Sequence, residues 1–266
     1  MKKTSKILIL LFSAAAVISC QREEAVKPVK AANHLKAAVW ETVIDASSLA
    51  SYSAFESKWS YLYPWGSDHN GSARMVGSSW DHSHIYLNGG VLSCKSTKVS
   101  GLGNIHYYSG TIYAKKQVLV TDQYPNWEVR GDFQCESQRG TWPAFWLTGA
   151  SSWPPESDIM EFKGNTNCWQ NTFRTSSDVT STITAVSSPG SWHTYRVWIQ
   201  KIDATNLQIH YYIDGVWKAQ HTANFVGKPM WIILDYQMEG SSGSPGPNAT
   251  TYMNAKNLYV GRTKAY

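Results

Sequence analysis

The chain has 266 residues, with 24 Lys and Arg against 19 Asp and Glu, and its aromatic residues include 13 Trp and 15 Tyr. Three lysines and no acids fall within the first 20 residues, so the rest of the chain carries 21 basic against 19 acidic residues. This near balance, without a basic cluster interleaved with aromatic residues, argues against a nucleic-acid partner.

The first 19 residues are typical of a signal peptide, because three lysines precede an apolar run at residues 7–18 that is too short to span a bilayer. The run ends at Ser19 and Cys20, in a sequence that resembles a bacterial lipobox, where the cysteine receives lipid. We therefore expect an exported bacterial lipoprotein at the outer membrane or cell surface, which contacts the membrane only through lipid on Cys20. Cleavage as an ordinary signal peptide, giving a secreted protein, is the alternative.

Residues 20–37 are polar and show no apolar period, which predicts a flexible tether. Residues 38–266 then suit one large domain. Short runs of alternating or β-branched residues recur there between Gly, Pro, Asn or Asp, without a sustained helical period, and this predicts an all-β antiparallel sandwich. The expected strands are Val91–Cys94, Thr111–Val120, Trp127–Cys135, Thr182–Val186, Thr194–Gln200, Leu207–Ile213, Trp231–Gln237 and Lys256–Val260.

Two connections in this domain have recognisable turn chemistry. Asp214 and Gly215 stand between two strand-like runs, which predicts a type I′ hairpin with no chemical role. The Gly- and Pro-rich loop at residues 240–248 follows a predicted strand, so we expect it to border a cleft or to cover the end of the sandwich.

Three carboxylates fall within six residues, at Glu156, Asp158 and Glu161. On a strand the first two point to one face and Glu161 to the other, unless a β-bulge at Ile159 and Met160 turns it back beside them. Such a cluster suits retaining glycoside hydrolysis, which needs a carboxylate nucleophile and a carboxylic acid, with a third acid to tune them. Taken alone, the spacing also fits a solvated strand face.

The neighbouring residues extend this motif. Gly140–Leu147, GTWPAFWL, followed by Glu156–Glu161, ESDIME, resembles the signature of glycoside hydrolase family 16 in the bulged form of laminarinases, agarases, porphyranases and carrageenases. Further matches are Tyr108–Lys115, Trp192–Trp198, Tyr211–Gly215 and Asn257–Arg262. The resemblance covers roughly residue 39 to the C-terminus. It implies a concanavalin A-like jelly roll with a concave substrate cleft, and an endo-acting, retaining hydrolase of internal β-glycosidic bonds in a polysaccharide.

The resemblance also implies roles for the three acids. Glu156 would be the nucleophile, Glu161 the general acid and then the base, and Asp158 the residue that positions Glu156 and tunes proton sharing. From the residues alone, the two glutamates are interchangeable.

Side chains near the acids are candidates for substrate contacts. We expect stacking on sugar rings or hydrogen bonds to hydroxyls or sulfate from Trp142, Trp146, Trp153, Trp169, Gln170, Arg174 and Arg74. Residues 168–174 depart from the Gly-Thr-Leu-His stretch of laminarinases, and no histidine occurs between His106 and His193. This slightly favours an algal galactan, of the agar, porphyran or carrageenan type, over laminarin-type β-1,3-glucan.

Two other classes fit the same fold. A lectin-like carbohydrate-binding module would use the acids only as hydrogen-bond acceptors, but it needs no third acid in a bulged strand. A polysaccharide lyase would need a Tyr or His base and charge neutralisation at a uronate, whereas this motif is rich in acids. We therefore favour hydrolysis.

Cofactors and cross-links leave little trace in the sequence. We expect no required cofactor and no metal-ligating side chains, although the resemblance leaves room for a structural calcium ion. Cys94, Cys135 and Cys168 match no zinc pattern, and their odd number favours buried free thiols at least in part. We expect a monomer.

Overall fold

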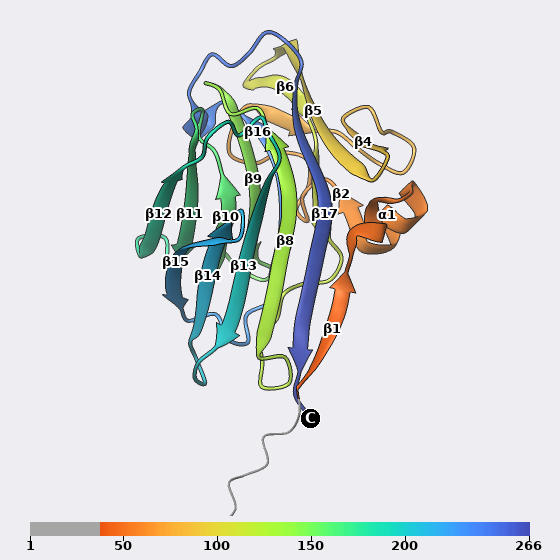
Figure 1. Cartoon of the computed structure of the whole chain (residues 1–266). Coiled ribbons are helices and arrows are strands. Elements are labelled where there is room, and N and C mark those ends of the chain that lie inside the picture. The colour runs from red at the N-terminus through yellow and green to blue at the C-terminus, as the bar shows by residue number, and fades with distance from the viewer. Residues whose placement is uncertain (1–37) are drawn as a thin grey trace, which may run out of the picture. The chain divides into compact units, whose positions relative to one another are not determined.

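The computed structural model describes residues 38–266, so the predicted signal peptide, Cys20 and the tether at residues 20–37 lie outside the described residues. Two β-sheets face each other, and Figure 1 shows β8, β13 and β17 in front of β9, β10 and β11. Within residues 38–266, no helix has the length and apolar character needed to cross a membrane.

The first sheet has ten strands and runs in the order β15-β14-β13-β8-β17-β5-β6-β3, with β1 beside β17 and β4 beside β5. These strands are β1 (Val39–Ile44), β3 (Ala73–Met75), β4 (Ile85–Asn88), β5 (Val91–Leu102), β6 (Ile105–Ser109), β8 (Asn126–Cys135), β13 (His193–Lys201), β14 (Leu207–Ile213), β15 (Val216–Ala223) and β17 (Thr251–Lys264).

The second sheet has seven strands in the order β12-β11-β10-β9-β16-β7-β2. They are β2 (Trp59–Tyr61), β7 (Thr111–Ala114), β9 (Thr141–Gly149), β10 (Glu156–Glu161), β11 (Asn167–Phe173), β12 (Val179–Ala185) and β16 (Met230–Met238). All its pairings are antiparallel, and in the first sheet only β3 and β6 run parallel. The predicted all-β sandwich of jelly-roll type is therefore confirmed.

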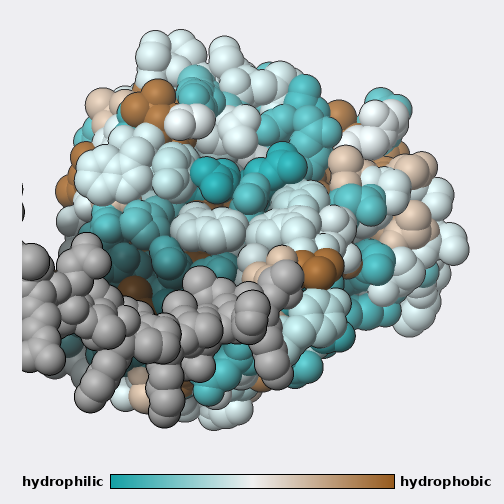
Figure 2. Space-filling view, turned by 60° about the horizontal axis from the view of Figure 1, so that its bottom comes forward, coloured by the Kyte–Doolittle hydropathy of each residue, from teal (hydrophilic) through white to brown (hydrophobic). Residues whose placement is uncertain are grey.

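The core lies between the sheets, and strand alternation explains its composition. Every second residue of β8 is buried, including Trp127, Val129 and Phe133. The ring of Phe133 meets Phe145 of β9 across the core with centroids 4.8 Å apart. Burial of each large apolar side chain of this kind contributes about 1.5–3 kcal/mol to folding. The face in Figure 2 shows hydrophobic residues only as small, separate patches.

The local predictions hold in most places. The strand at Leu207–Ile213 has the predicted bounds, and Asp214 and Gly215 have φ angles of 52° and 74°, as a type I′ turn requires. The strand predicted at Thr111–Val120 is shorter in the structure and ends at Ala114.

The described chain also contains helices that its periodicity does not reveal. They are α1 (Tyr52–Lys58) and the 3-10 helices η1 (Ala46–Leu49) and η2 (Gly240–Ser242). The Ser51 hydroxyl caps α1 by accepting a hydrogen bond from the Ala54 N–H, and Phe55 anchors the helix in the core. Seven residues are too few to establish an apolar helical period.

The cysteines in the described part of the chain are reduced. Cys94, Cys135 and Cys168 are buried free thiols, as the odd count suggested. Burial raises the pKa of each thiol, so all three remain protonated and unreactive at neutral pH.

Candidate active site

A bulge in β10 brings the three acids together. The pairing of β10 with β9 moves from Asp158 opposite Trp146 to Met160 opposite Phe145, so Ile159 is the extra residue. The parity of the strand changes there, and Glu161 returns to the face of Glu156 and Asp158. The predicted bulge is confirmed, and the three carboxylates line one pocket of about 600 Å³ on the outward face of the seven-stranded sheet.

Two tryptophans hold the outer two acids. The indole N–H of Trp153 donates to Glu156 Oε2 at 2.7 Å, and that of Trp142 donates to Glu161 Oε1 at 2.7 Å. Trp153 lies at the rim of the pocket and is half exposed. Trp142 lies on β9, the strand next to β10. A neutral N–H donor fixes each carboxylate without neutralising its charge. The indoles therefore position the acids as well as forming the walls of the pocket.

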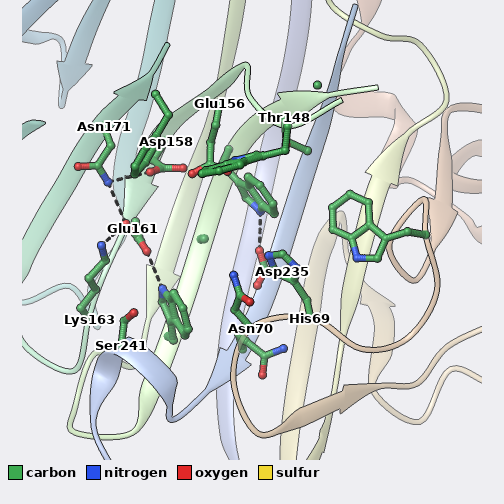
Figure 3. A pocket seen from close by; sticks show the side chains of 18 of the residues that line it. His69, Asn70, Thr148, Glu156, Asp158, Glu161, Lys163, Asn171, Asp235 and Ser241 are labelled. Atoms are coloured by element: carbon green, nitrogen blue, oxygen red, sulfur yellow. Dashed lines mark hydrogen bonds and ion pairs between the residues drawn. The ribbon is translucent and has the colours of Figure 1, made fainter. Parts of the chain in front are cut away.

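Glu161 has two further partners, which Figure 3 shows pointing at its carboxylate. The side-chain amide of Asn171 donates to both Asp158 Oδ2, at 2.7 Å, and Glu161 Oε2, at 3.1 Å. The ammonium of Lys163 lies 3.0 Å from Glu161 Oε2 and also covers the ring of Trp169, 4.7 Å from its centroid. The bridging amide fixes the spacing of these two acids, and Lys163 balances negative charge on Glu161.

A fourth carboxylate, Asp235 of β16, lies on the pocket floor. Its Oδ1 accepts a hydrogen bond from the Trp146 indole at 2.6 Å, and its Oδ2 accepts one from the Tyr63 hydroxyl at 3.1 Å. Trp65 stacks on Tyr63 with centroids 5.1 Å apart, and His69 stacks on Trp146 at 5.7 Å. Asp235 thus ties the floor to the loop at residues 62–70, which forms the opposite wall.

The environment of the acids favours their protonated forms. Burial raises the pKa of Glu156 to about 7, and the charge of Glu161 adds to this, while the bond from Trp153 and the charge of Lys163 oppose it. Burial and the two neighbouring glutamates raise the pKa of Asp158 well above its usual range. The protonated form of Asp158 is therefore favoured, and this reduces the negative charge of the cluster.

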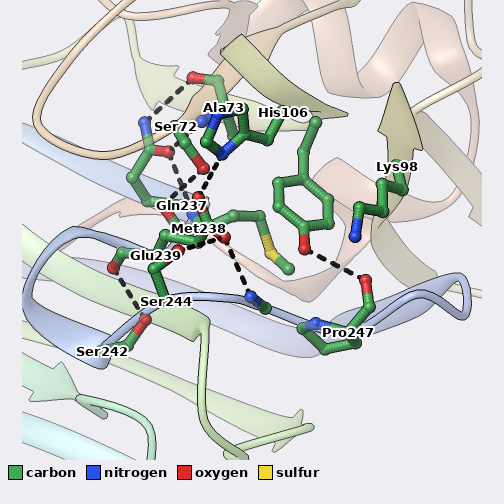
Figure 4. Close-up of polar contacts among 12 residues, drawn as sticks. Ser72, Ala73, Lys98, His106, Gln237, Met238, Glu239, Ser242, Ser244 and Pro247 are labelled. Carbon is green, nitrogen blue, oxygen red and sulfur yellow. Dashed lines mark hydrogen bonds and ion pairs between the residues drawn. The ribbon is translucent and has the colours of Figure 1, made fainter. Parts of the chain in front are cut away.

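The loop that follows β16 closes one side of the pocket with Ser241. Glu239 holds this loop: its Oε1 accepts bonds from the Ser244 hydroxyl and the Gly246 N–H, and its Oε2 pairs with His106 Nδ1 at 2.5 Å. Figure 4 shows this network. Burial alone would raise the pKa of Glu239, but its hydrogen bonds lower it to about 2. The prediction that the loop borders a cleft is confirmed.

Comparison with known proteins places this chain in a family. The model of glycosyl hydrolases family 16 matches residues 73–253, which include the bulged strand and every residue that lines the pocket except Trp65, His69 and Asn70. This chain belongs to glycoside hydrolase family 16. The family acts with retention of configuration, so the chain is a retaining glycoside hydrolase, and the lectin and lyase alternatives are set aside.

Relatives of this family 16 hydrolase differ in similarity. A galactan endo-beta-1,3-galactanase from Flammulina velutipes is 41% identical over 234 residues, covering 84% of this chain and 90% of that protein. The endo-1,3-1,4-beta-glycanase ExsH of Rhizobium meliloti (strain 1021) is 27% identical over 194 residues, which cover 68% of this chain and 39% of that protein. The structure of endo-1,3-beta-glucanase from Streptomyces sioyaensis matches with a TM-score of 0.67 at 20% identity, covering 91% of this chain and 100% of that chain.

Three of the tryptophans expected to contact substrate line the pocket of this family 16 hydrolase: Trp142, Trp146 and Trp153. Trp169 does not line it. The ring of Trp169 points to the same side of β11 as Asn171, but it lies beneath Lys163. Lys163 thus separates Trp169 from the acids.

The structure places the remaining three candidates outside the pocket. Gln170 is fully buried between the sheets and donates to the Ile159 carbonyl, because its parity on β11 is opposite to that of Asn171. Arg174 is engaged by both carboxylate oxygens of Asp178 and lies outside the pocket. Arg74 is likewise paired with Asp68, at 2.7 Å. None of the three reaches the acids.

Sequence reasoning missed several pocket residues, which come from four separate segments. They are Trp65, His69 and Asn70 of the loop at 62–70, Lys163, Asn171 and Asp235. Asp235 had a usable signal, since it is an acid within the apolar strand run Ile-Ile-Leu-Asp-Tyr, where an unpaired charge is costly. For the others, the strand pairing that brings them to the acids is not visible in the chain.

The reaction of family 16 uses no cofactor. Among residues 38–266, no cluster of three or more His, Cys, Asp or Glu side chains could hold a metal ion. The structural calcium ion therefore remains a prediction without support from side chains.

Proposed function

We propose that this family 16 enzyme is an endo-acting hydrolase of a galactan with β-1,3 linkages. The main support is its 41% identity, over nearly the whole length of both chains, with a protein named galactan endo-beta-1,3-galactanase. The pocket supplies the matching chemistry, since four carboxylates and four tryptophans line it. The sequence favoured an algal galactan, and the algal origin of the substrate remains part of the proposal.

In the first chemical step, Glu156 attacks the anomeric carbon and Glu161 gives its proton to the glycosidic oxygen, so the bond to the leaving sugar breaks and a glycosyl ester forms on Glu156. In the second step, Glu161 removes a proton from water, which attacks the same carbon and releases Glu156. The Trp153 N–H stabilises the ionised nucleophile. Lys163 balances the charge left on Glu161 after it has given up its proton.

Asp158 acts between the two glutamates. Because burial and the neighbouring glutamates favour the protonated form of Asp158, it separates their charges without adding a full third one. The bridging amide of Asn171 keeps Asp158 and Glu161 in register. We assign Asp158 a positioning role and the two glutamates the covalent and proton-transfer roles.

A substrate screen tests this function. Purified enzyme is incubated with β-1,3-galactan, laminarin, agarose, porphyran, carrageenans and mixed-linkage glucan, and products are separated by chromatography. We expect a ladder of β-1,3-galacto-oligosaccharides early in the reaction, as internal cleavage requires. Release of galactose alone would contradict the endo mode, and cleavage of laminarin but not galactan would contradict the substrate.

We also propose that the enzyme is exported as a monomeric lipoprotein anchored through Cys20, at the outer membrane or cell surface. The support is the lysine-rich start and the lipobox-like sequence that ends at Cys20. Lipid labelling of cells that express the wild type or the C20S variant tests the anchor, and light scattering of the purified domain tests the monomer. Label on both proteins would contradict lipidation at Cys20.

A further inference from the structure

Asp235 is a buried pocket carboxylate that the hydrolytic steps do not use. Only 4% of its surface is exposed, and that surface faces the pocket. Trp146 and Tyr63 donate one hydrogen bond to each of its oxygens. A carboxylate has about four acceptor positions, so this one retains capacity for further donors. An amide oxygen could support both aromatic donors at a lower burial cost, so positioning them does not by itself explain an acid here.

The register of the sheet places Asp235 at a defined distance from the acid on β10. Glu161 pairs with Ala144, and Ala144 pairs with Asp235, so the three lie in one row across β10, β9 and β16. The backbones of Glu161 and Asp235 are therefore roughly 10 Å apart, twice the spacing between neighbouring strands. Ala144 has only a methyl group between them, and the larger Trp142 and Trp146 flank it along β9. The row forms a hollow between two carboxylates.

The wall above this hollow offers polar groups without protein partners. His69 packs among the rings of Tyr63, Trp65 and Trp146. Burial lowers the pKa of His69, so it is neutral at neutral pH. Within residues 38–266, neither its ring nitrogens nor the Asn70 amide forms a hydrogen bond with protein, and both residues line the same pocket as Asp235 (Figure 3). The hollow can therefore enclose one sugar ring and bind its hydroxyls.

A galactosyl ring differs from a glucosyl ring in the direction of one hydroxyl, at C4. In galactose this hydroxyl is axial and projects out of the ring plane, whereas all ring hydroxyls of β-glucose are equatorial. A ring that lies flat over Ala144 directs only axial groups into the floor. On the basis of the proposed galactanase function, we propose that Asp235 accepts a hydrogen bond from the axial O4 hydroxyl of the galactosyl residue over Ala144. Asp235 is then the residue that selects galactan over glucan.

Synthetic substrates test this contact. Wild-type enzyme and the D235A variant are assayed on β-1,3-galactotetraose and on analogues that lack the 4-hydroxyl at one residue at a time. For the wild type, we expect one analogue to lose about 10- to 100-fold in kcat/KM, as for a lost hydrogen bond that leaves a buried acceptor unsatisfied. In D235A the same analogue and the parent should react at similar rates. Because each ratio is taken within one enzyme, general damage to the variant cancels.

The Y63F variant is the matched control, because it removes the other donor to Asp235 Oδ2 but leaves the carboxylate. Y63F should show the same loss of kcat/KM on the 4-deoxy analogue as the wild type. A purely structural role of Asp235 does not explain that result. An equal penalty in wild type and D235A would overturn the proposal. If D235A does not fold, the wild-type enzyme alone still tests the proposal. The proposal is overturned when no 4-deoxy analogue lowers kcat/KM by more than about twofold, which is within assay scatter. Failure of the wild type to cleave any β-1,3-galactan would instead reject the proposed function.

Discussion

The two sides of the pocket are built differently. The acids on β10 come from one contiguous stretch, Glu156 to Glu161, and a single bulge brings them together. The opposite side combines Asp235 of β16 with Trp65, His69 and Asn70 of a loop about 165 residues earlier, joined by the Tyr63–Asp235 hydrogen bond. The first side carries the chemistry that the family shares. The second side holds none of the residues assigned to bond cleavage, and we therefore expect substrate choice to depend on it.

The largest effect should come from removing an acid on the first side. E156Q and E161Q should each lower kcat by about 10³-fold or more while the thermal unfolding midpoint stays close to that of the wild type, because nucleophile and proton donor are lost without a change in shape. The E128Q variant, on the outward face of the ten-stranded sheet, is the control and should keep full activity. Near-native turnover in E156Q or E161Q would remove that residue from the mechanism.

Azide separates the roles of the two glutamates with an activated galactoside. In E161Q the glycosyl ester on Glu156 still forms, so azide should give the β-galactosyl azide. In E156Q azide replaces the nucleophile and should give the α-azide. The anomer is read from the proton coupling constant in NMR spectra. The reverse pattern would exchange the two assignments.

A smaller loss is expected for the amide that bridges the acids. In N171A, Asp158 and Glu161 lose a common donor, and kcat should fall by about 10- to 100-fold with little change in KM. The Q170A variant is the neighbouring control, because that side chain points into the core and not into the pocket. Q170A should lose stability but retain turnover per folded molecule. A rise in KM alone for N171A would show that Asn171 binds substrate instead of positioning the acids.

The pH profile should report the environment of Glu156. Since the nucleophile must be ionised and burial raises its pKa to about 7, kcat/KM should rise with pH through that region. The Trp153 hydrogen bond lowers this pKa, so W153F should move the acid limb to higher pH. An acid limb that is unchanged in W153F would show that Trp153 does not influence the pKa of Glu156.

The smallest effect is expected for the arginines that sequence reasoning proposed as substrate contacts. Arg174 is held by Asp178, outside the pocket, so R174A should change kcat/KM by less than about twofold, as is typical of surface substitutions. The same variant assayed on a sulfated galactan gives the stricter test. A loss of kcat/KM on the sulfated galactan alone would show that Arg174 contacts substrate.

The contrast between the two sides also explains how far the sequence could lead. Glu156, Asp158 and Glu161, and even their bulge, were predictable because strand parity and a short motif depend on neighbours in the chain. Gln170 and Asn171 differ by one position, and only the register of β11 decides which of them faces the pocket. Strand alternation shows that the two side chains point to opposite faces, but without the register of β11 it does not show which one faces the pocket.

Longer-range features were out of reach for a related reason. The sequence shows that Arg174 is a cation, but it does not show that Asp178 has already engaged it. Asp235 is visible as an acid in an apolar strand, yet its partners Trp146 and Tyr63 lie 89 and 172 residues away. Such pairings are made by the sheet order, which local patterns do not specify.

The most direct test of the account is the ratio of initial rates for wild-type enzyme on β-1,3-galactan and laminarin of equal chain length. Both polymers have the same linkage, so the ratio isolates the direction of the C4 hydroxyl. We expect the galactan to react at least about 10-fold faster, and D235A to bring the two rates together. An equal or faster rate on laminarin would contradict both the galactanase function and the role of Asp235.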